Sequence, residues 1–205
     1  MKCSSHLLVT FLLTSACGPS NSLAGEIPSQ TFSISNATVG VTTLTDVQRI
    51  YGKTEAIRVS QEDGADVRVC YVRSSPKGDS FLVFESGVMG SFKEITGFRI
   101  STLRPKGNCA STKVELNSLK TGNGIKLGLG LEDFKKAVPV EFEHRDSEFI
   151  YEAVTKRAAT QEELNKLRVR WPNEKQDYFD VTMTLRAKFK DNRLIELYVH
   201  KIESY

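Results

Sequence analysis

The chain has 205 residues, of which 40% are hydrophobic and 26% are charged, and its formal net charge is +3. This composition argues against an intrinsically disordered chain, because disordered segments are poorer in apolar residues and carry a larger net charge. The small positive excess gives no basis for nucleic-acid binding, which requires clustered basic residues. The length allows one sizeable core or two small ones.

The first segment has the residue order of a secretory signal. Lys2 precedes a short apolar run over residues 7–13, and small residues follow. This run is much shorter than the roughly 20 apolar residues that a membrane-spanning helix needs. Residues 22–24, Ser-Leu-Ala, fit ordinary cleavage of a signal peptide 1–24. We therefore expect an exported protein, released into the periplasm.

A second processing site competes with the first. Residues 13–17, followed by a stretch that contains Ser and Asn, resemble a bacterial lipoprotein signal. The resemblance implies a signal over 1–16, lipidation of Cys17 and a flexible tether over 17–30. The protein would then be anchored to the outer membrane through its lipid. Both alternatives place the chain in the cell envelope.

Two cysteines remain after either processing event, Cys70 and Cys109. An even pair in an oxidising compartment is most simply one disulfide bond. Two separate buried thiols are the alternative. Neither cysteine belongs to a Cys-x-x-Cys pair, so we expect neither redox catalysis nor a zinc site.

Residues 31–110 predict a first α+β unit. Thr43 is expected to cap a helix with Asp46 in its first turn, and Gly52 is expected to end it. The predicted buried face of this helix consists of Leu44, Val47, Ile50 and Tyr51. Strands are predicted at residues 56–59, 67–72, 80–85 and 97–101.

Residues 111–124 are rich in Ser, Asn, Thr and Gly and predict a linker. The order of elements then repeats over residues 125–205, which predict a second α+β unit. It contains a helix over 132–138, a strand over 149–156 and two long strands over 178–190 and 194–202. A capping box from Thr160 to Glu163 opens a further helix, whose Leu164 and Leu167 are expected to face inward.

The last two strands also predict their own pairing. A two-residue loop would place Glu196 on the apolar face, whereas a three-residue loop over 191–193 pairs Ala187 with Leu197 and Phe189 with Ile195. Lys188 then faces Glu196 on the other side. We therefore expect the three-residue loop, with one residue in the left-handed region.

The two units open with similar sequences. Residues 40–47 read Gly-Val-Thr-Thr-Leu-Thr-Asp-Val, and residues 127–134 read Leu-Gly-Leu-Gly-Leu-Glu-Asp-Phe. The pattern resembles the repeat of small outer-membrane assembly lipoproteins of the SmpA/OmlA (BamE-like) type, and two such repeats resemble the β-lactamase inhibitory proteins. The resemblance implies an α+β fold of two sequential helix-plus-antiparallel-meander repeats, with short helices packed on one face of the sheet. It transfers no functional residue, because these families bind partners through variable surfaces.

The residues that usually carry catalysis are sparse. The chain has no Gly-x-Ser-x-Gly turn, no His-Glu-x-x-His and no phosphate-binding loop. His144 lies near Glu141 and Glu143 and could contact a metal, but a solvated charged surface is the more common use of such residues. We expect a non-enzymatic protein with no catalytic, cofactor or metal site.

A basic and aromatic face is the best candidate for binding. Arg186, Lys188, Tyr198 and His200 share the outward side of the last two strands. Interfaces are enriched in Tyr, Trp and Arg, and the neighbouring helix adds Arg168, Arg170 and Trp171. We therefore expect a module that binds another envelope protein through this face. The alternatives are a solvated face with Trp171 in the core, a purely structural lipoprotein, or a secreted enzyme or metal-binding protein of unrecognised type.

Overall fold

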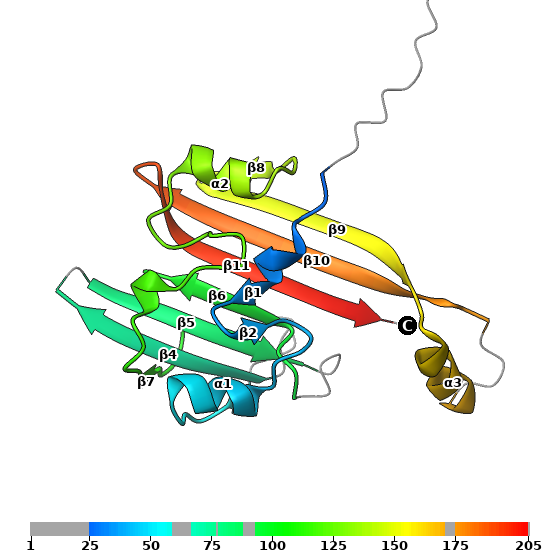
Figure 1. Ribbon diagram of the computed structural model, residues 1–205. Helices are drawn as coiled ribbons and strands as arrows, with labels where there is room; N and C mark the ends of the chain where they lie inside the picture. Colours follow the sequence, from blue (N-terminus) through cyan, green and yellow to red (C-terminus); the bar gives the residue numbers. More distant parts are fainter. Residues whose placement is uncertain (1–24, 59–66, 77, 88–92, 171–174, 205) are drawn as a thin grey trace, which may run out of the picture.

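The computed structural model describes residues 25–58, 67–76, 78–87, 93–170 and 175–204. The predicted signal peptide and Cys17 lie outside the described residues, as does Trp171. The fold is mixed α+β, as the sequence predicts, with a nine-stranded, mostly antiparallel main sheet and a separate two-stranded sheet (Figure 1). No helix in the described part of the chain has the length and apolar character needed to cross a membrane.

The chain is conveniently divided into two halves. The elements of the first half are η1 (Ser29–Phe32), β1 (Ser33–Ile34), β2 (Ala37–Thr38), α1 (Leu44–Tyr51), β3 (Ile57–Arg58), β4 (Val67–Ser75), β5 (Gly78–Ser86), β6 (Gly97–Ser101) and β7 (Ala110–Ser111). After η4 (Leu116–Ser118), the second half contains α2 (Leu131–Ala137), β8 (Glu143–Arg145), β9 (Glu148–Ala158), α3 (Gln161–Arg170), β10 (Tyr178–Lys190) and β11 (Arg193–Ser204).

The strand order of the main sheet is β3-β4-β5-β6-β11-β10-β9-β8, with β7 added in parallel to β4. β6 of the first half and β11 of the second half therefore lie side by side at the centre of the sheet. Each half continues outward through two further strands that precede this central strand in the sequence. Short β3 and β8 lie at the two ends of this order.

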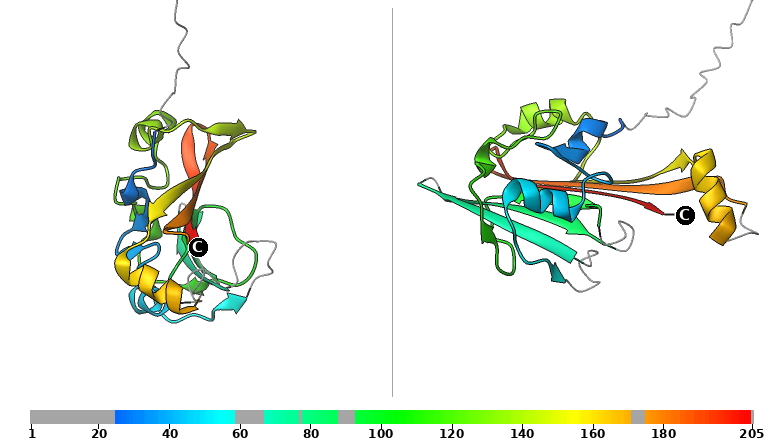
Figure 2. Two further views of the ribbon diagram at one scale, coloured as in Figure 1. Left: turned by 90° about the vertical axis from the view of Figure 1, so that its right-hand side faces the viewer. Right: turned by 60° about the horizontal axis from the view of Figure 1, so that its bottom comes forward.

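One hydrophobic core covers one face of the sheet, here called the core face. It contains Leu82 of β5 and Leu185 of β10 from the sheet, together with Val47 of α1 and Phe134 of α2 from the helices. The three α-helices lie on this side of the sheet (Figure 2). The opposite side is here called the outer face.

The core also includes segments that the sequence assigns to a tether and a linker. Ile27, within residues 17–30, is buried, and so is Phe32 of η1. Leu116 and Leu119, within residues 111–124, are buried as well. A single core therefore joins the N-terminal segment, the connection and both halves.

Helix α1 begins and ends as predicted. The Asp46 backbone N–H donates to the Thr43 hydroxyl at 3.1 Å, and the Thr43 N–H donates to the Asp46 carboxylate at 3.2 Å. Gly52 ends the helix with φ 108°, in the left-handed range that favours glycine. The predicted inward face is confirmed except for Ile50, which is 36% exposed at the margin of that face.

The β10–β11 hairpin differs from the predicted loop. Lys190 pairs with Arg193, so the connection has two residues, Asp191 and Asn192, which both have positive φ. A bulge at Ile195 then shifts the register, so that Phe189 pairs with Leu194 instead of Ile195. The predicted pairs of Ala187 with Leu197 and Lys188 with Glu196 are confirmed.

The three-residue loop was wrong because it assumed a regular ladder. A two-residue turn with two left-handed residues has the twist that antiparallel strands prefer. One extra residue in β11 then restores the apolar side chains to the core face. Leu194, rather than Ile195, is the buried residue at this end of the strand.

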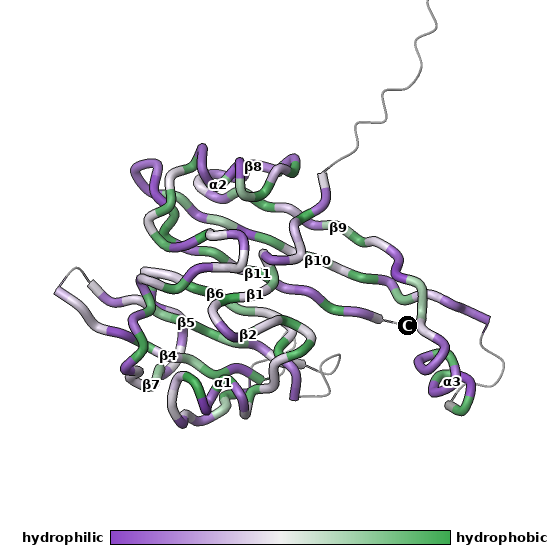
Figure 3. The backbone as a smooth tube through the Cα atoms, in the orientation of Figure 1, coloured by the Kyte–Doolittle hydropathy of each residue, from purple (hydrophilic) through white to green (hydrophobic). Residues whose placement is uncertain are grey.

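The distal ends of β9, β10 and β11 extend beyond the core as an arm that carries α3 (Figure 1). Leu164 and Leu167, predicted to face inward, are only half-buried. Charged groups hold α3 instead: Arg157 of β9 pairs with Glu163 of α3 at 2.9 Å and with Glu203 of β11 at 2.7 Å. Figure 3 shows α3 as a mostly hydrophilic element, in contrast to the body.

Candidate functional site

The outer face of the first half is covered. Residues 102–109, here called the strap, leave β6 and cross this face, and Leu103 and Pro105 line a small cavity of about 40 Å³ with Phe81 and Val83 of β5. Cys109 at the end of the strap forms a disulfide with Cys70 of β4, their Cα atoms 4.6 Å apart. The predicted disulfide is confirmed. Its effect is to hold the strap over the sheet.

The outer face of the second half carries the predicted binding residues. In the β10–β11 ladder Arg186 is opposite Tyr198, Lys188 is opposite Glu196 and Thr184 is opposite His200. Side chains of directly paired residues lie on the same face of a sheet. The fold therefore brings Arg186, Lys188, Tyr198 and His200 together, and this group with its neighbours on β9 is here called the open face.

Tyr198 and His200 form a stacked pair at the centre of the sheet. Their rings are 6.0 Å apart between centroids and inclined by 11°. The guanidinium carbon of Arg99 on β6 lies 5.1 Å from the Tyr198 ring centroid. Arg99 Nε is buried and has no hydrogen-bond partner among the described residues. The Tyr198 ring therefore contacts a guanidinium group with one N–H that makes no hydrogen bond among the described residues.

Glycine at position 97 creates the space for this pair. A Cβ added there would lie 2.7 Å from the Val199 carbonyl oxygen and 3.0 Å from His200 Cδ2. The absence of a side chain allows the imidazole ring to lie close to the sheet. Gly97 is therefore a packing requirement of the open face.

Burial keeps both rings neutral near pH 7. Burial lowers the pKa of His200, which favours the uncharged imidazole. Burial, and secondly the neighbouring Glu85 carboxylate, raise the pKa of Tyr198. The Tyr198 hydroxyl donates to that carboxylate at 3.1 Å. The pair offers aromatic area and polar edges rather than a charge.

The cations of the open face are paired with acids. Arg186 Nη2 lies 2.9 Å from Glu152 of β9, and Lys188 Nζ lies 3.2 Å from Glu196 and 4.0 Å from Glu148. The face is consequently a row of alternating charges beside an aromatic pair. Sequence reasoning missed Glu152 and Glu148 because they reach this face only when β9 pairs with β10.

The other predicted residues lie elsewhere. Arg168 is exposed on α3 at the end of the arm, and Arg170 ends the same helix. Neither is part of the group formed by Arg186, Lys188, Tyr198 and His200. Trp171 lies outside the described residues.

His144, the other histidine considered for chemistry, lies on β8. Its ring contacts Phe149 edge-on at 4.7 Å, and the neighbouring Arg145 binds Glu143 through two contacts of 2.7 and 2.9 Å. In the part of the chain that the structure describes, no three His, Cys, Asp or Glu side chains are grouped so as to hold a metal ion.

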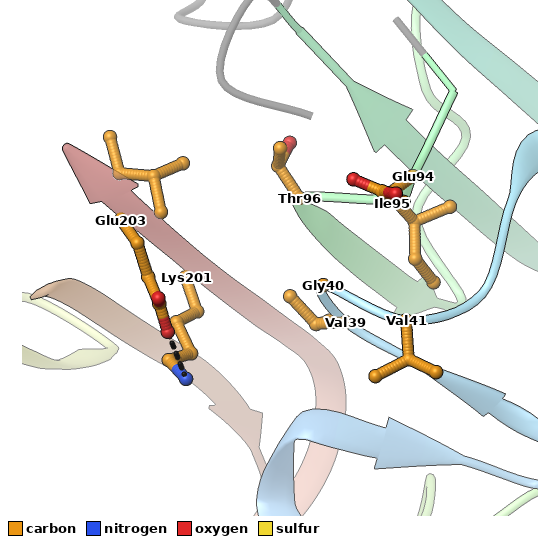
Figure 4. A pocket seen from close by; sticks show the side chains of 9 residues that line it. Val39, Gly40, Val41, Glu94, Ile95, Thr96, Lys201 and Glu203 are labelled. Carbon is orange, nitrogen blue, oxygen red and sulfur yellow. Dashed lines mark ion pairs between the residues drawn. The ribbon is translucent and has the colours of Figure 1, made fainter. Parts of the chain in front are cut away.

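A hollow of about 300 Å³ opens where the two halves meet on the core side, lined by residues 39–41, 94–96 and 201–203 (Figure 4). Two of its charged side chains neutralise each other, because Lys201 pairs with Glu203 at 3.0 Å. Most of the other lining side chains are apolar, among them the buried Val39 and Ile95. Such a lining offers a ligand apolar contact but few hydrogen-bonding groups that would orient it. The open face therefore remains the stronger candidate for a binding site.

Comparisons of the chain with protein-family models, curated proteins and solved structures found no match.

Proposed function

We propose that this protein is a non-enzymatic binding module of the cell envelope, which engages a protein partner through the open face. The observation that carries the proposal is the difference between two equivalent surfaces of one sheet. The strap covers the first, whereas the second displays Arg186, Tyr198 and His200. Aromatic side chains and Arg contribute much of the binding energy in known interfaces.

The charge pattern favours a protein over a polyanion as the partner. A membrane surface or an acidic polymer would be attracted by an excess of unpaired cations. On the open face, Arg186 and Lys188 are already matched by carboxylates. A mixed row of this kind fixes the orientation of a partner with complementary charges and adds specificity.

We also propose that the protein is exported, either as a soluble periplasmic protein or as a lipoprotein anchored through Cys17. The disulfide between Cys70 and Cys109 supports this location, because such bonds persist in oxidising compartments.

The same proposal includes a tandem repeat of the BamE-like type. In the first half, Gly40 N–H donates to the Ile95 carbonyl at 2.8 Å, and Ile95 N–H donates to the Thr42 carbonyl at 2.9 Å. Thr42 immediately precedes the N-cap of α1. These bonds tie the start of the helix to the chain that enters β6.

The second half contains corresponding bonds. Gly128 N–H donates to the Leu194 carbonyl at 2.8 Å, and Leu194 N–H donates to the Leu129 carbonyl at 2.9 Å. Leu129 immediately precedes the N-cap of α2. At the centre, Arg99 of β6 is opposite Tyr198 of β11, and the same sequence offset relates these two residues and relates Ile95 to Leu194. This symmetry supports a duplication.

Charge reversal on the open face tests the binding proposal. Arg186→Glu places two carboxylates side by side, and Lys136→Glu on α2 is the matched control, because it makes the same charge change on the helix side. We expect affinity capture from envelope extract to lose one defined protein with Arg186→Glu and to retain it with Lys136→Glu.

A swap variant separates binding from folding. Arg186→Glu combined with Glu152→Arg restores the internal ion pair in the opposite orientation. Its melting temperature should match that of the wild type, while the captured protein should still be lost. Capture that is identical for the wild type, the single variant and the swap variant would overturn the proposal.

A further inference from the structure

The outer edge of β9 presents backbone groups without a strand partner. β8 pairs with β9 only over residues 148–150, although β9 continues to Ala158. Over residues 151–158 no strand of the described chain pairs with this edge. An edge of this kind is a template for a further strand.

The direction of the backbone groups along this edge follows from one hydrogen bond. Phe189 N–H of β10 donates to the Ser147 carbonyl at 3.2 Å. In an antiparallel ladder, alternate residues direct their N–H and C=O groups to the same neighbour. Odd-numbered residues of β9 therefore bond to β10, and Glu152, Val154 and Lys156 direct their N–H and C=O groups to the free edge.

The first half shows that this position accepts a strand. Tyr71 of β4 is opposite Leu82, and Tyr151 of β9 is opposite Leu185, so the two tyrosines hold corresponding places. β7 pairs with β4 at Tyr71 and Val72. The matching residues of β9, Tyr151 and Glu152, have no such strand among the described residues.

From this geometry we infer that β9 pairs with β9 of a second copy of this chain, antiparallel and centred on Val154. In this register Val154 is opposite Val154 of the other copy, and Glu152 is opposite Lys156. The twofold symmetry produces the pair of Glu152 and Lys156 twice, once on each side of Val154. The result is one continuous sheet across two copies.

Side-chain chemistry selects this register. Val154 is 67% exposed on the outer face, and contact with its counterpart removes apolar surface from water. Charged residues on an edge strand usually discourage pairing. Here the two charges are opposite in sign and symmetrically placed about Val154, so each finds a complementary partner. Registers centred one residue to either side place Glu152 and Lys156 opposite uncharged residues.

The ladder is short, which limits its strength. Ile150 is already paired with Glu143 of its own β8, so pairing between copies ends before that residue. We therefore expect a concentration-dependent dimer rather than an obligate one. Lys156 lies outside the group that forms the aromatic part of the open face, so loss of the dimer and loss of partner binding are separable.

Charge complementation tests the register. Glu152→Lys alone places lysines opposite each other, and Lys156→Glu alone places glutamates opposite each other. Each variant should be monomeric in sedimentation equilibrium at concentrations where the wild type dimerises. An equimolar mixture of the two variants should dimerise again, because both lysines of one variant then lie opposite the two glutamates of the other.

Val154→Pro provides a second test that leaves the fold intact. Its N–H faces the free edge, so proline removes a donor to the second copy and none to β10. We expect loss of the dimer with an unchanged melting temperature. A wild type that stays monomeric at all concentrations, or a dimer that survives both Val154→Pro and Lys156→Glu, would overturn the inference. Protection of these amides only when another protein is added would assign the edge to a foreign strand, and would overturn it equally.

Discussion

The outer faces of the two halves differ although the ladders beneath them correspond. Val83 of β5 lies opposite Arg99, and Arg186 of β10 lies opposite Tyr198, so the two residues hold matching places. Val83 is 3% exposed beneath the strap, whereas the side chain of Arg186 is 46% exposed. In the first half the strap buries this surface, whereas in the second half the corresponding surface is accessible to solvent.

The comparison teaches that the same sheet geometry supports two uses. Apolar outward residues such as Phe81 and Val83 require a cover, because their exposure would cost free energy. Polar outward residues such as Thr184 and Arg186 need none. Binding is therefore expected where the outward side chains are stable in water but still contain aromatic area.

The largest expected effect on stability comes from a large-to-small substitution in the core of the first half. Phe84→Ala removes a fully buried ring that lies 5.4 Å from Tyr51 between centroids. We expect a loss of about 3–5 kcal/mol in the free energy of unfolding. Val154→Ala, at an exposed site of the second half, should change the free energy of unfolding by less than about 0.5 kcal/mol. Urea titration measures both, and equal losses would refute the contrast.

Removal of the disulfide is expected to open the strap. The bond closes a chain separation of 39 residues, and its replacement by Cys70→Ala and Cys109→Ala should cost about 2–4 kcal/mol. Amide hydrogen exchange should rise in residues 102–109 and in the outer part of β4. Exchange in β10 should stay unchanged, and a uniform rise in both halves would contradict a local cover.

An alanine at Gly97 tests the junction between the halves. The new Cβ would meet the Val199 carbonyl oxygen at 2.7 Å, and the strain should cost about 1–3 kcal/mol. The NMR signals of the His200 ring should shift, because the imidazole must move away from β6. Unchanged ring signals would show that the open face does not need glycine there.

The smallest expected effect on stability concerns α3, because this helix is held by charged and polar contacts rather than by the core. The Arg157 side chain, and then the Thr160 backbone N–H, hold the pKa of Glu163 at about 2, below its ordinary value of 4.5. A carboxyl with a depressed pKa stabilises the fold above pH 4.5 and loses that contribution as the pH falls towards 2. NMR signals of residues 161–170 should therefore show release of α3 over this range. Glu163→Gln should abolish the pH dependence, and its persistence in that variant would exclude Glu163 as the cause.

Local signals in the sequence predicted much of the fold. The capping residues Thr43 and Asp46, the bounds of β6 and β10, and the cysteine pair were all found from neighbouring residues or from parity. Each depends on interactions within a few residues or on a simple count. The four residues of the open face on β10 and β11 were found in the same way, from alternation along two adjacent strands.

The remaining features depend on distant contacts. Glu152 reaches Arg186 because β9 pairs with β10, although α3 separates the two strands in the sequence. The position of the strap likewise depends on the bond between Cys109 and the distant Cys70. The bulge at Ile195 was missed because Ile195, Leu197 and Val199 alternate as they would in a regular strand. Only the pairing with β10 shows that Leu194, three residues before Leu197, is the buried residue at this end. No single stretch of sequence contains this information.

Site-specific photo-crosslinking tests the central claim most directly. A photoreactive residue at position 184 on the open face should join the protein to one defined envelope protein in living cells. The same residue at Leu103 on the strap, or at Lys136 on α2, should not. Adducts of equal yield from all three positions, or from the strap alone, would contradict the assignment of binding to the open face.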